Sequence, residues 1–88
     1  MPSIVIFSLD GCLHCKNLKN SLNKLNISFI DVEIGQNQKL WDKVVEQTGH
    51  NVLPTVFIKQ ENTEDGPVYI PGRDYQTEDE IVEILKNL

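Results

Sequence analysis

The sequence predicts an α/β fold in which a four-stranded mixed sheet carries helices on both faces. Short apolar runs of strand length alternate with longer stretches whose apolar residues recur every three or four positions. The element order is β-α-β-α-β-β-α. Its first half is a βαβ unit, which should join two parallel strands by a right-handed crossover. The last two strands are close enough in sequence to form an antiparallel hairpin.

The first strand and the first helix lie on either side of a short connection. Ile4 to Phe7 is continuously apolar, as suits a strand that is buried on both faces. The helix that follows has apolar residues at spacings of three, four and three, which form one face. These residues are Cys15, Leu18, Leu22 and Leu25. Asn26 ends the pattern.

The second strand and helix are separated by a polar break. The strand is predicted at residues 29–34, with alternate residues on one side: Ile30, Val32 and Ile34. Gly35-Gln36-Asn37 interrupts this pattern. The helix then carries a stripe formed by Leu40, Trp41, Val44, Val45 and Thr48. Gly49 is placed to cap its C-terminus, because glycine readily adopts the left-handed conformation found there.

The last third of the chain predicts a hairpin and a helix. Thr55 to Ile58 is the third strand and residues 68–70 are the fourth, with turn-forming residues at 62–67 between them. Thr77 and Glu80 have the spacing of a capping box that opens the last helix. The inner face of this helix is predicted to contain Ile81, Ile84, Leu85 and Leu88.

Length and composition limit the possible functions. The 88 residues predict a single domain over residues 1–88. The net charge of −5 argues against nucleic acid as a general partner. No stretch approaches the roughly 20 apolar residues of a membrane span, and the N-terminus lacks the features of a signal peptide. We therefore expect a cytoplasmic protein, a monomer that binds neither membranes nor nucleic acid.

The two cysteines of the chain form a Cys12-Leu13-His14-Cys15 motif between the first strand and the first helix. In a reducing compartment such a pair is more often catalytic or metal-binding than a structural bridge. The thiolate is the attacking form of cysteine. At a helix N-terminus the pKa of a cysteine falls from about 8.5 to between about 3.5 and 7.5, because N–H groups and the helix dipole stabilise the thiolate. The motif therefore predicts thiol–disulfide exchange.

The helical spacing predicts a different role for each cysteine. Cys15 lies on the apolar stripe and should be turned inward, whereas Cys12 precedes the first full turn and should be exposed. We predict that Cys12 attacks and that Cys15 resolves the mixed disulfide. His14 and Lys16 are predicted to tune the Cys12 thiolate. The alternative is that both are solvated helix residues without a redox effect.

Beyond the motif, the whole chain resembles a glutaredoxin, a minimal member of the thioredoxin superfamily. The cysteine pair directly follows the first strand, and residues 48–54 (T-G-H-N-V-L-P) resemble the family's T-G-x-x-T-V-P segment. The resemblance implies that Pro54 is cis and faces the cysteines. It also implies that the backbone of Leu53 pairs with the cysteine of glutathione, like a short antiparallel strand. Leu13 and Val52 belong to the same expected binding surface.

A further segment, residues 70–74 (I-P-G-R-D), resembles the family's I-G-G-x-[DST] turn. In glutaredoxins this turn binds the γ-glutamyl end of glutathione. The resemblance implies that Gly72, Arg73 and Asp74 have this role, with the Asp74 carboxylate accepting the ligand's ammonium. Several residues depart from the family pattern: Leu9 in place of a Lys or Arg, Leu13 and His14 in place of Pro-Tyr, and Pro71 in place of the first glycine.

These features predict a dithiol glutaredoxin that uses glutathione as co-substrate, with no metal. Its partners would be disulfide-containing or glutathionylated proteins, with ribonucleotide reductase as one candidate. Two alternatives are a redoxin of the same shape reduced by thioredoxin reductase, and a redox-regulated module that binds peptides beside Pro54 without turnover. Two metal-based alternatives are an iron–sulfur carrier with one Cys12 from each of two subunits, and a zinc site that would need two more ligands.

Overall fold

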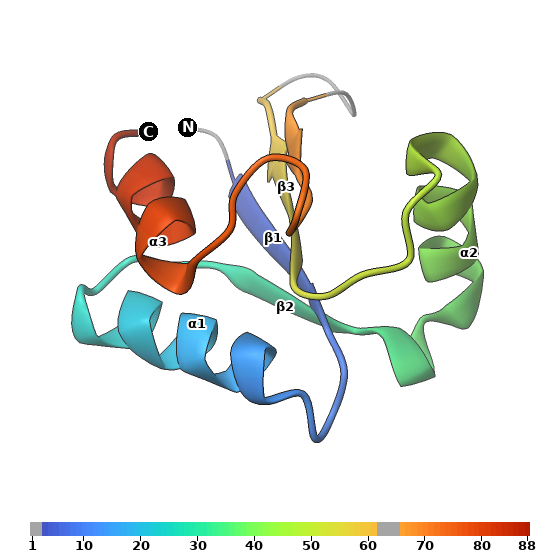
Figure 1. Cartoon of the computed structure of the whole chain (residues 1–88), viewed down its shortest axis with the longest axis horizontal. Helices are drawn as coiled ribbons and strands as arrows, with labels where there is room; N and C mark the ends of the chain where they lie inside the picture. The colour runs from blue at the N-terminus through green and yellow to red at the C-terminus, as the bar shows by residue number, and fades with distance from the viewer. Residues whose placement is uncertain (1–2, 62–65) are drawn as a thin grey trace.

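The computed structural model of the chain describes residues 3–61 and 66–88. Its strands and helices follow the predicted order, with a short 3-10 helix, η1, between the second strand and the second helix (Figure 1). The elements are β1 (Ser3–Ser8), α1 (Leu13–Lys24), β2 (Ile30–Glu33), η1 (Ile34–Gln36), α2 (Gln38–Thr48), β3 (Thr55–Lys59), β4 (Val68–Tyr69) and α3 (Glu78–Lys86). No helix in these two ranges is long and apolar enough to cross a membrane.

The four strands form one mixed sheet in the order β2-β1-β3-β4. β1 pairs with β2 in parallel, whereas β1–β3 and β3–β4 are antiparallel. Phe7 at the end of β1 lies between Val32 of β2 and Thr55 of β3. Figure 1 shows α1 and α3 side by side on one face of the sheet and α2 on the other. This arrangement confirms the predicted mixed sheet with helices on both faces.

Alternation along β1 divides the apolar core into two clusters, because successive side chains of a strand point to opposite faces. The larger cluster joins the sheet to α1 and α3, and its buried members are Ile4, Ile6, Leu18, Leu22, Val56, Ile58, Tyr75, Ile81 and Leu85. The smaller cluster lies beneath α2 and contains Phe7, Ile34 and Trp41. The rings of Phe7 and Trp41 are 5.5 Å apart between centroids. Trp41 therefore provides the main buried contact between α2 and the sheet.

The two predicted helix ends are present. Gly49 ends α2 with φ 74°, and its N–H donates to the Val45 carbonyl at 2.8 Å. Thr77 caps α3, since its hydroxyl accepts a hydrogen bond from the Glu80 N–H at 3.2 Å. Both caps satisfy backbone groups that a helix end otherwise leaves without partners.

Several expectations about individual side chains are wrong. Ile34 begins η1 rather than ending a strand, because the Glu33 carboxylate accepts from the Gly35 N–H and turns the chain there. Val5 is only partly buried, because α2 covers one end of its sheet face. Four side chains predicted to be inward-facing or strand-packed are exposed, and all lie near the ends of their elements: Leu25, Ile30, Leu40 and Leu88. The predicted turn at residues 62–65 lies outside the described residues.

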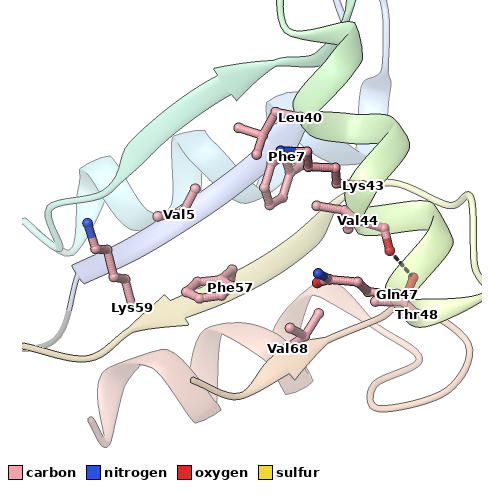
Figure 2. Close-up of a pocket in the computed structure, with 10 residues that line it drawn as sticks. All are labelled: Val5, Phe7, Leu40, Lys43, Val44, Gln47, Thr48, Phe57, Lys59 and Val68. Carbon is pink, nitrogen blue, oxygen red and sulfur yellow. Dashed lines mark hydrogen bonds between the residues drawn. The ribbon is translucent and has the colours of Figure 1, made fainter. Parts of the chain in front are cut away.

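A groove of about 540 Å³ lies between α2 and the part of the sheet that α2 does not cover (Figure 2). Val5, Phe57 and Val68 line it on the sheet side, and α2 contributes residues such as Leu40 and Val44. Phe57 lies on the face of the sheet that α2 covers, opposite the face that α1 covers. The groove is therefore separate from the cysteine pair, which α1 carries.

Candidate active site

The connection between β1 and α1 places Cys12 at the N-terminus of the helix. Gly11 adopts φ 89°, a left-handed conformation that favours glycine, and the Cys12 N–H donates to the Leu9 carbonyl at 3.0 Å. This tight turn makes Cys12 the N-cap residue of α1. The Cys12 sulfur accepts a hydrogen bond from the Cys15 N–H at 3.3 Å. The start of the helix thus directs a backbone donor at the sulfur.

The two cysteines differ in exposure and are joined by a disulfide. Cys15 is 1% exposed, which confirms its predicted inward position, whereas Cys12 is partly exposed. Their Cα atoms are 5.3 Å apart. The structure therefore represents the oxidised form, in which Cys12 is the more exposed residue of the pair. The assignment of Cys12 as attacker and Cys15 as resolver stays a prediction.

The electrostatic environment at the start of α1 favours a thiolate at Cys12. No acidic residue lies in the first turn of this 12-residue helix. After reduction, the Cys15 N–H and the positive end of the helix dipole would act on the Cys12 sulfur in its charged form. The thiolate form of Cys12 stays a prediction, which these groups support.

The segment that faces the cysteine-bearing helix contains a cis peptide bond between Leu53 and Pro54, as the resemblance implied. Leu53, Pro54 and His14 line a common cavity of about 170 Å³. Pro54 therefore lies across from the first turn of α1. Val52 is exposed and does not line this cavity. It is also absent from the lining of a second cavity, of about 360 Å³, that contains Cys12.

Three side-chain hydrogen bonds hold this Pro54 segment, and the sequence interpretation identified none of them. The Trp41 indole N–H donates to the Asn51 side-chain oxygen at 3.0 Å. The Thr55 hydroxyl donates to the Val52 carbonyl at 2.7 Å. The buried Tyr75 hydroxyl donates to the Pro54 carbonyl, and burial raises the pKa of Tyr75 well above its ordinary value. The only signal in the sequence was that buried Trp and Tyr need polar partners.

We expect Tyr75→Phe to destabilise the protein by about 1–3 kcal/mol, because it leaves the buried Pro54 carbonyl without its donor. Urea unfolding followed by far-UV circular dichroism measures this loss. Tyr69→Phe on β4 is the matched control, and it should lower the free energy of unfolding by less. Equal midpoints for the two variants would show that the Tyr75 hydroxyl does not stabilise the segment.

The turn at residues 72–74 is closed by its own hydrogen bonds. Asp74 Oδ2 accepts from the Ile70 N–H at 2.8 Å and from Arg73 Nε at 2.9 Å. Burial alone would raise the pKa of Asp74, but the hydrogen bonds from Arg73 and Ile70 and the Arg73 charge leave it below its ordinary value. Gly72, with φ 86°, Arg73 and Asp74 line neither cavity near the cysteines. Their role in binding glutathione stays a prediction.

The residues predicted to tune the thiolate lie on two sides of the motif. His14 is exposed and faces the Pro54 segment across the smaller cavity. Lys16 is exposed and lines a second cavity of about 360 Å³ beside Cys12, together with Leu13. Their effects on the Cys12 thiolate also stay predictions. Within residues 3–61 and 66–88, no group of three or more His, Cys, Asp and Glu residues could hold a metal ion.

Beneath the first helix, Asp31 joins β1, β2 and α1. The Ser8 hydroxyl donates to its carboxylate at 2.6 Å and the Lys19 ammonium at 2.9 Å. Burial alone would raise the pKa of Asp31, but the hydrogen bonds from Ser8 and Lys19 and the Lys19 charge together hold it below its ordinary value of 3.8. The carboxylate therefore stays ionised at neutral pH and ties Lys19 of α1 to β2.

The lowered pKa of Asp31 predicts a pH-dependent contribution to stability. The contribution is fully present above the unfolded-state pKa of 3.8 and is lost as pH falls through the lower pKa of the folded state. Its size should stay below about 1 kcal/mol, because the side chain is 40% exposed. Urea midpoints of wild type and Asp31→Asn should therefore differ at pH 6, and the difference should shrink as pH falls below 3.8. A difference that stays constant over this range would contradict the ionic origin, and Asp42→Asn on α2 serves as the control.

Comparison with known proteins gives a consistent family. A sequence model described as Glutaredoxin matches residues 4–62. The chain is 31% identical over 64 residues to N-acetyl-S-hydroxy-L-cysteine reductase of Bacillus subtilis, covering 73% of this chain and 69% of that protein. It is 34% identical over 59 residues to a glutaredoxin of Vernicia fordii, covering 64% of this chain but only 57% of that protein.

A solved structure supports the fold. A buckwheat glutaredoxin–glutathione complex superposes with a TM-score of 0.58 at 24% identity, over 66% of this chain and 56% of that chain. The likeness confirms the thioredoxin-like fold of glutaredoxin type. The chain thus spans little more than half the length of the two plant proteins. Since the family model covers residues 4–62, including both cysteines and the Pro54 segment, this chain belongs to the glutaredoxin family.

Proposed function

We propose that the protein is a dithiol oxidoreductase that reduces disulfides through Cys12 and Cys15, with glutathione as its reductant. The observation that carries the proposal is the asymmetry of the pair. Cys12 is partly exposed, and its sulfur caps α1 by accepting a hydrogen bond from the Cys15 N–H, whereas Cys15 is buried. This asymmetry supports our proposal that Cys12 reacts with the substrate and that Cys15 reacts with Cys12.

The proposed reaction proceeds through two exchanges. The Cys12 thiolate attacks a substrate disulfide, a mixed disulfide forms, and the first substrate sulfur leaves as a thiolate that takes up a proton. The Cys15 thiolate then attacks the Cys12 sulfur and releases the second substrate thiol. Two electrons have passed to the substrate, and the pair is left as the disulfide seen in the structure.

Glutathione would restore the dithiol. One glutathione thiolate attacks the Cys12–Cys15 disulfide and bonds to Cys12, and a second releases glutathione disulfide. The cis-Pro54 segment supports this proposal, because Leu53 and Pro54 line the cavity that His14 of the cysteine motif also lines. We propose that the Leu53 backbone pairs there with the extended glutathione peptide. The buckwheat relative is a glutaredoxin–glutathione complex, which is consistent with this choice. We propose disulfide-containing or glutathionylated proteins as substrates, ribonucleotide reductase as one candidate, and the cytoplasm as the location.

A second candidate substrate comes from the Bacillus subtilis relative, whose name describes reduction of N-acetyl-S-hydroxy-L-cysteine. A sulfenic acid suits the same site. The Cys12 thiolate would attack its sulfur, and the hydroxyl would leave with a proton as water. Cys15 would then resolve the mixed disulfide and release the thiol, so that the same two electrons are transferred.

One coupled assay tests these proposals. The protein is mixed with bis(2-hydroxyethyl) disulfide and supplied with glutathione, glutathione reductase and NADPH, and NADPH loss is followed. The second arrangement replaces the glutathione system with thioredoxin reductase. Turnover in the first supports the proposal. Turnover only in the second would reject glutathione as the reductant, and no turnover in either would favour a binding module. Replacing the disulfide with N-acetyl-S-hydroxy-L-cysteine tests the second candidate substrate.

A further inference from the structure

Two exposed leucines flank the attacking sulfur. Leu9 is 44% exposed at the end of β1, and Leu13 is 65% exposed in the first turn of α1. Both line the cavity of about 360 Å³ that contains Cys12. Of the described residues with large exposed apolar side chains, Leu9 and Leu13 are the ones that line this cavity with Cys12. Leu9 and Leu13 thus give the cavity beside Cys12 an apolar part that a substrate could contact.

The charged residues that line this cavity leave no net charge that would favour an ionic ligand. Lys19 lines it, but its ammonium already contacts the Asp31 carboxylate at 2.9 Å. The remaining charged residues of the lining are Asp10 and Lys16, one of each sign. An anionic group attracted by Lys16 would thus be repelled by Asp10, and a cationic group attracted by Asp10 would be repelled by Lys16. An apolar group, in contrast, can pack against Leu9 and Leu13 without depending on either charge.

We propose that this cavity is a subsite for an uncharged, apolar substituent of the substrate, carried on the sulfur that bonds to Cys12. The inference rests on the proposed exchange reaction and adds the chemical class of substrate that reacts best. The cavity volume lies within the range of about 300–1,000 Å³ that is typical of small-ligand sites. A propyl or butyl group bonded through sulfur to Cys12 would cover part of both leucines.

The expected selectivity follows from the apolar area that this contact removes from water. Covering about half of one exposed leucine side chain should increase the rate constant for exchange roughly fivefold, provided that the contact is made in the transition state. A carboxylate in the same place gains nothing from the leucines. The substitutions Leu9→Ser and Leu13→Ser should therefore affect apolar substrates selectively.

The test uses single-turnover exchange of the fully reduced protein, so that no glutathione is needed. Three symmetrical disulfides avoid any ambiguity over which sulfur is attacked: dipropyl disulfide, bis(2-hydroxyethyl) disulfide and dithiodiglycolate. Thiol trapping follows the reaction. Each rate constant is divided by that protein's rate of Cys12 alkylation with iodoacetamide, which corrects for altered thiolate reactivity.

For Leu9→Ser and Leu13→Ser, the ratio of the dipropyl to the dithiodiglycolate rate constant should fall about fivefold each. Leu25→Ser is the matched control, because Leu25 is 46% exposed at the opposite end of α1, and its ratio should equal that of wild type. An unchanged ratio in both leucine variants would overturn the subsite while leaving the exchange reaction in place. Selective slowing of dithiodiglycolate by Lys16→Gln, with no effect of the leucine variants, would assign an anionic substrate instead. Failure of the reduced wild-type protein to react with all three disulfides would reject the exchange reaction itself.

Discussion

Replacing Cys12 with serine should abolish thiol–disulfide exchange, because the partly exposed sulfur at the N-cap of α1 is the one that substrates can reach. A serine hydroxyl is not appreciably ionised at neutral pH and cannot form a disulfide. The coupled assay with bis(2-hydroxyethyl) disulfide should therefore fall to its background rate. Alkylation of the remaining Cys15 by iodoacetamide should also be slow, since Cys15 is 1% exposed.

Cys15→Ser gives the complementary result. Cys12 should still attack, but without a resolving thiol the variant should accumulate one equivalent of mixed disulfide, which mass spectrometry of the intact protein detects. The mass should return to that of the free protein after dithiothreitol is added. If Cys15→Ser abolished alkylation at neutral pH and Cys12→Ser did not, the roles of the two cysteines would be reversed.

Trp41→Ala should cause the largest loss of stability, about 3–5 kcal/mol. Trp41 is 3% exposed, packs on Phe7 and donates its indole N–H to Asn51. A domain of this size is typically stable by roughly 5–10 kcal/mol, so the variant should be close to unfolding at room temperature. Urea unfolding by far-UV circular dichroism is the measurement, because the substitution removes the chain's one tryptophan.

Two further substitutions show where the Trp41 effect originates. Leu40→Ala changes the adjacent residue, which is 46% exposed, and should stay within about 0.5 kcal/mol of wild type. Trp41→Phe keeps an aromatic ring over Phe7 but removes the donor to Asn51, so its cost should be intermediate. A loss below 1 kcal/mol for Trp41→Ala would show that α2 is not anchored to the sheet by this side chain.

The sequence predicted elements best where a local rule applied to a long segment. The stripe of Cys15, Leu18 and Leu22 is buried as its spacing indicated, because helical geometry alone brings these residues to one face. The same rule failed for Leu25 and Leu88, which lie at or beyond the ends of their helices. Periodicity identifies the face of a helix, but neighbouring elements decide how far along it burial continues.

The candidate site shows the same division. Spacing and the strand before it indicated that Cys15 would be buried, and the family resemblance indicated the cis peptide at Pro54. The function of the turn at Gly72 was inferred from resemblance alone. In the structure the Asp74 carboxylate also closes that turn by accepting hydrogen bonds from Ile70 and Arg73, which its motif did not reveal.

The sequence by itself determined the order of strands and helices and the position of Cys12 at a helix N-terminus, because both follow from backbone geometry over a few residues. The tertiary structure decided which distant groups support the site. Ser8 meets Asp31 across 23 positions and Tyr75 meets Pro54 across 21. Such contacts depend on strand register and helix packing, which bring distant residues within hydrogen-bonding distance only in the folded chain. The apolar wall beside Cys12 likewise arises only when the end of β1 and the first turn of α1 are folded around one cavity.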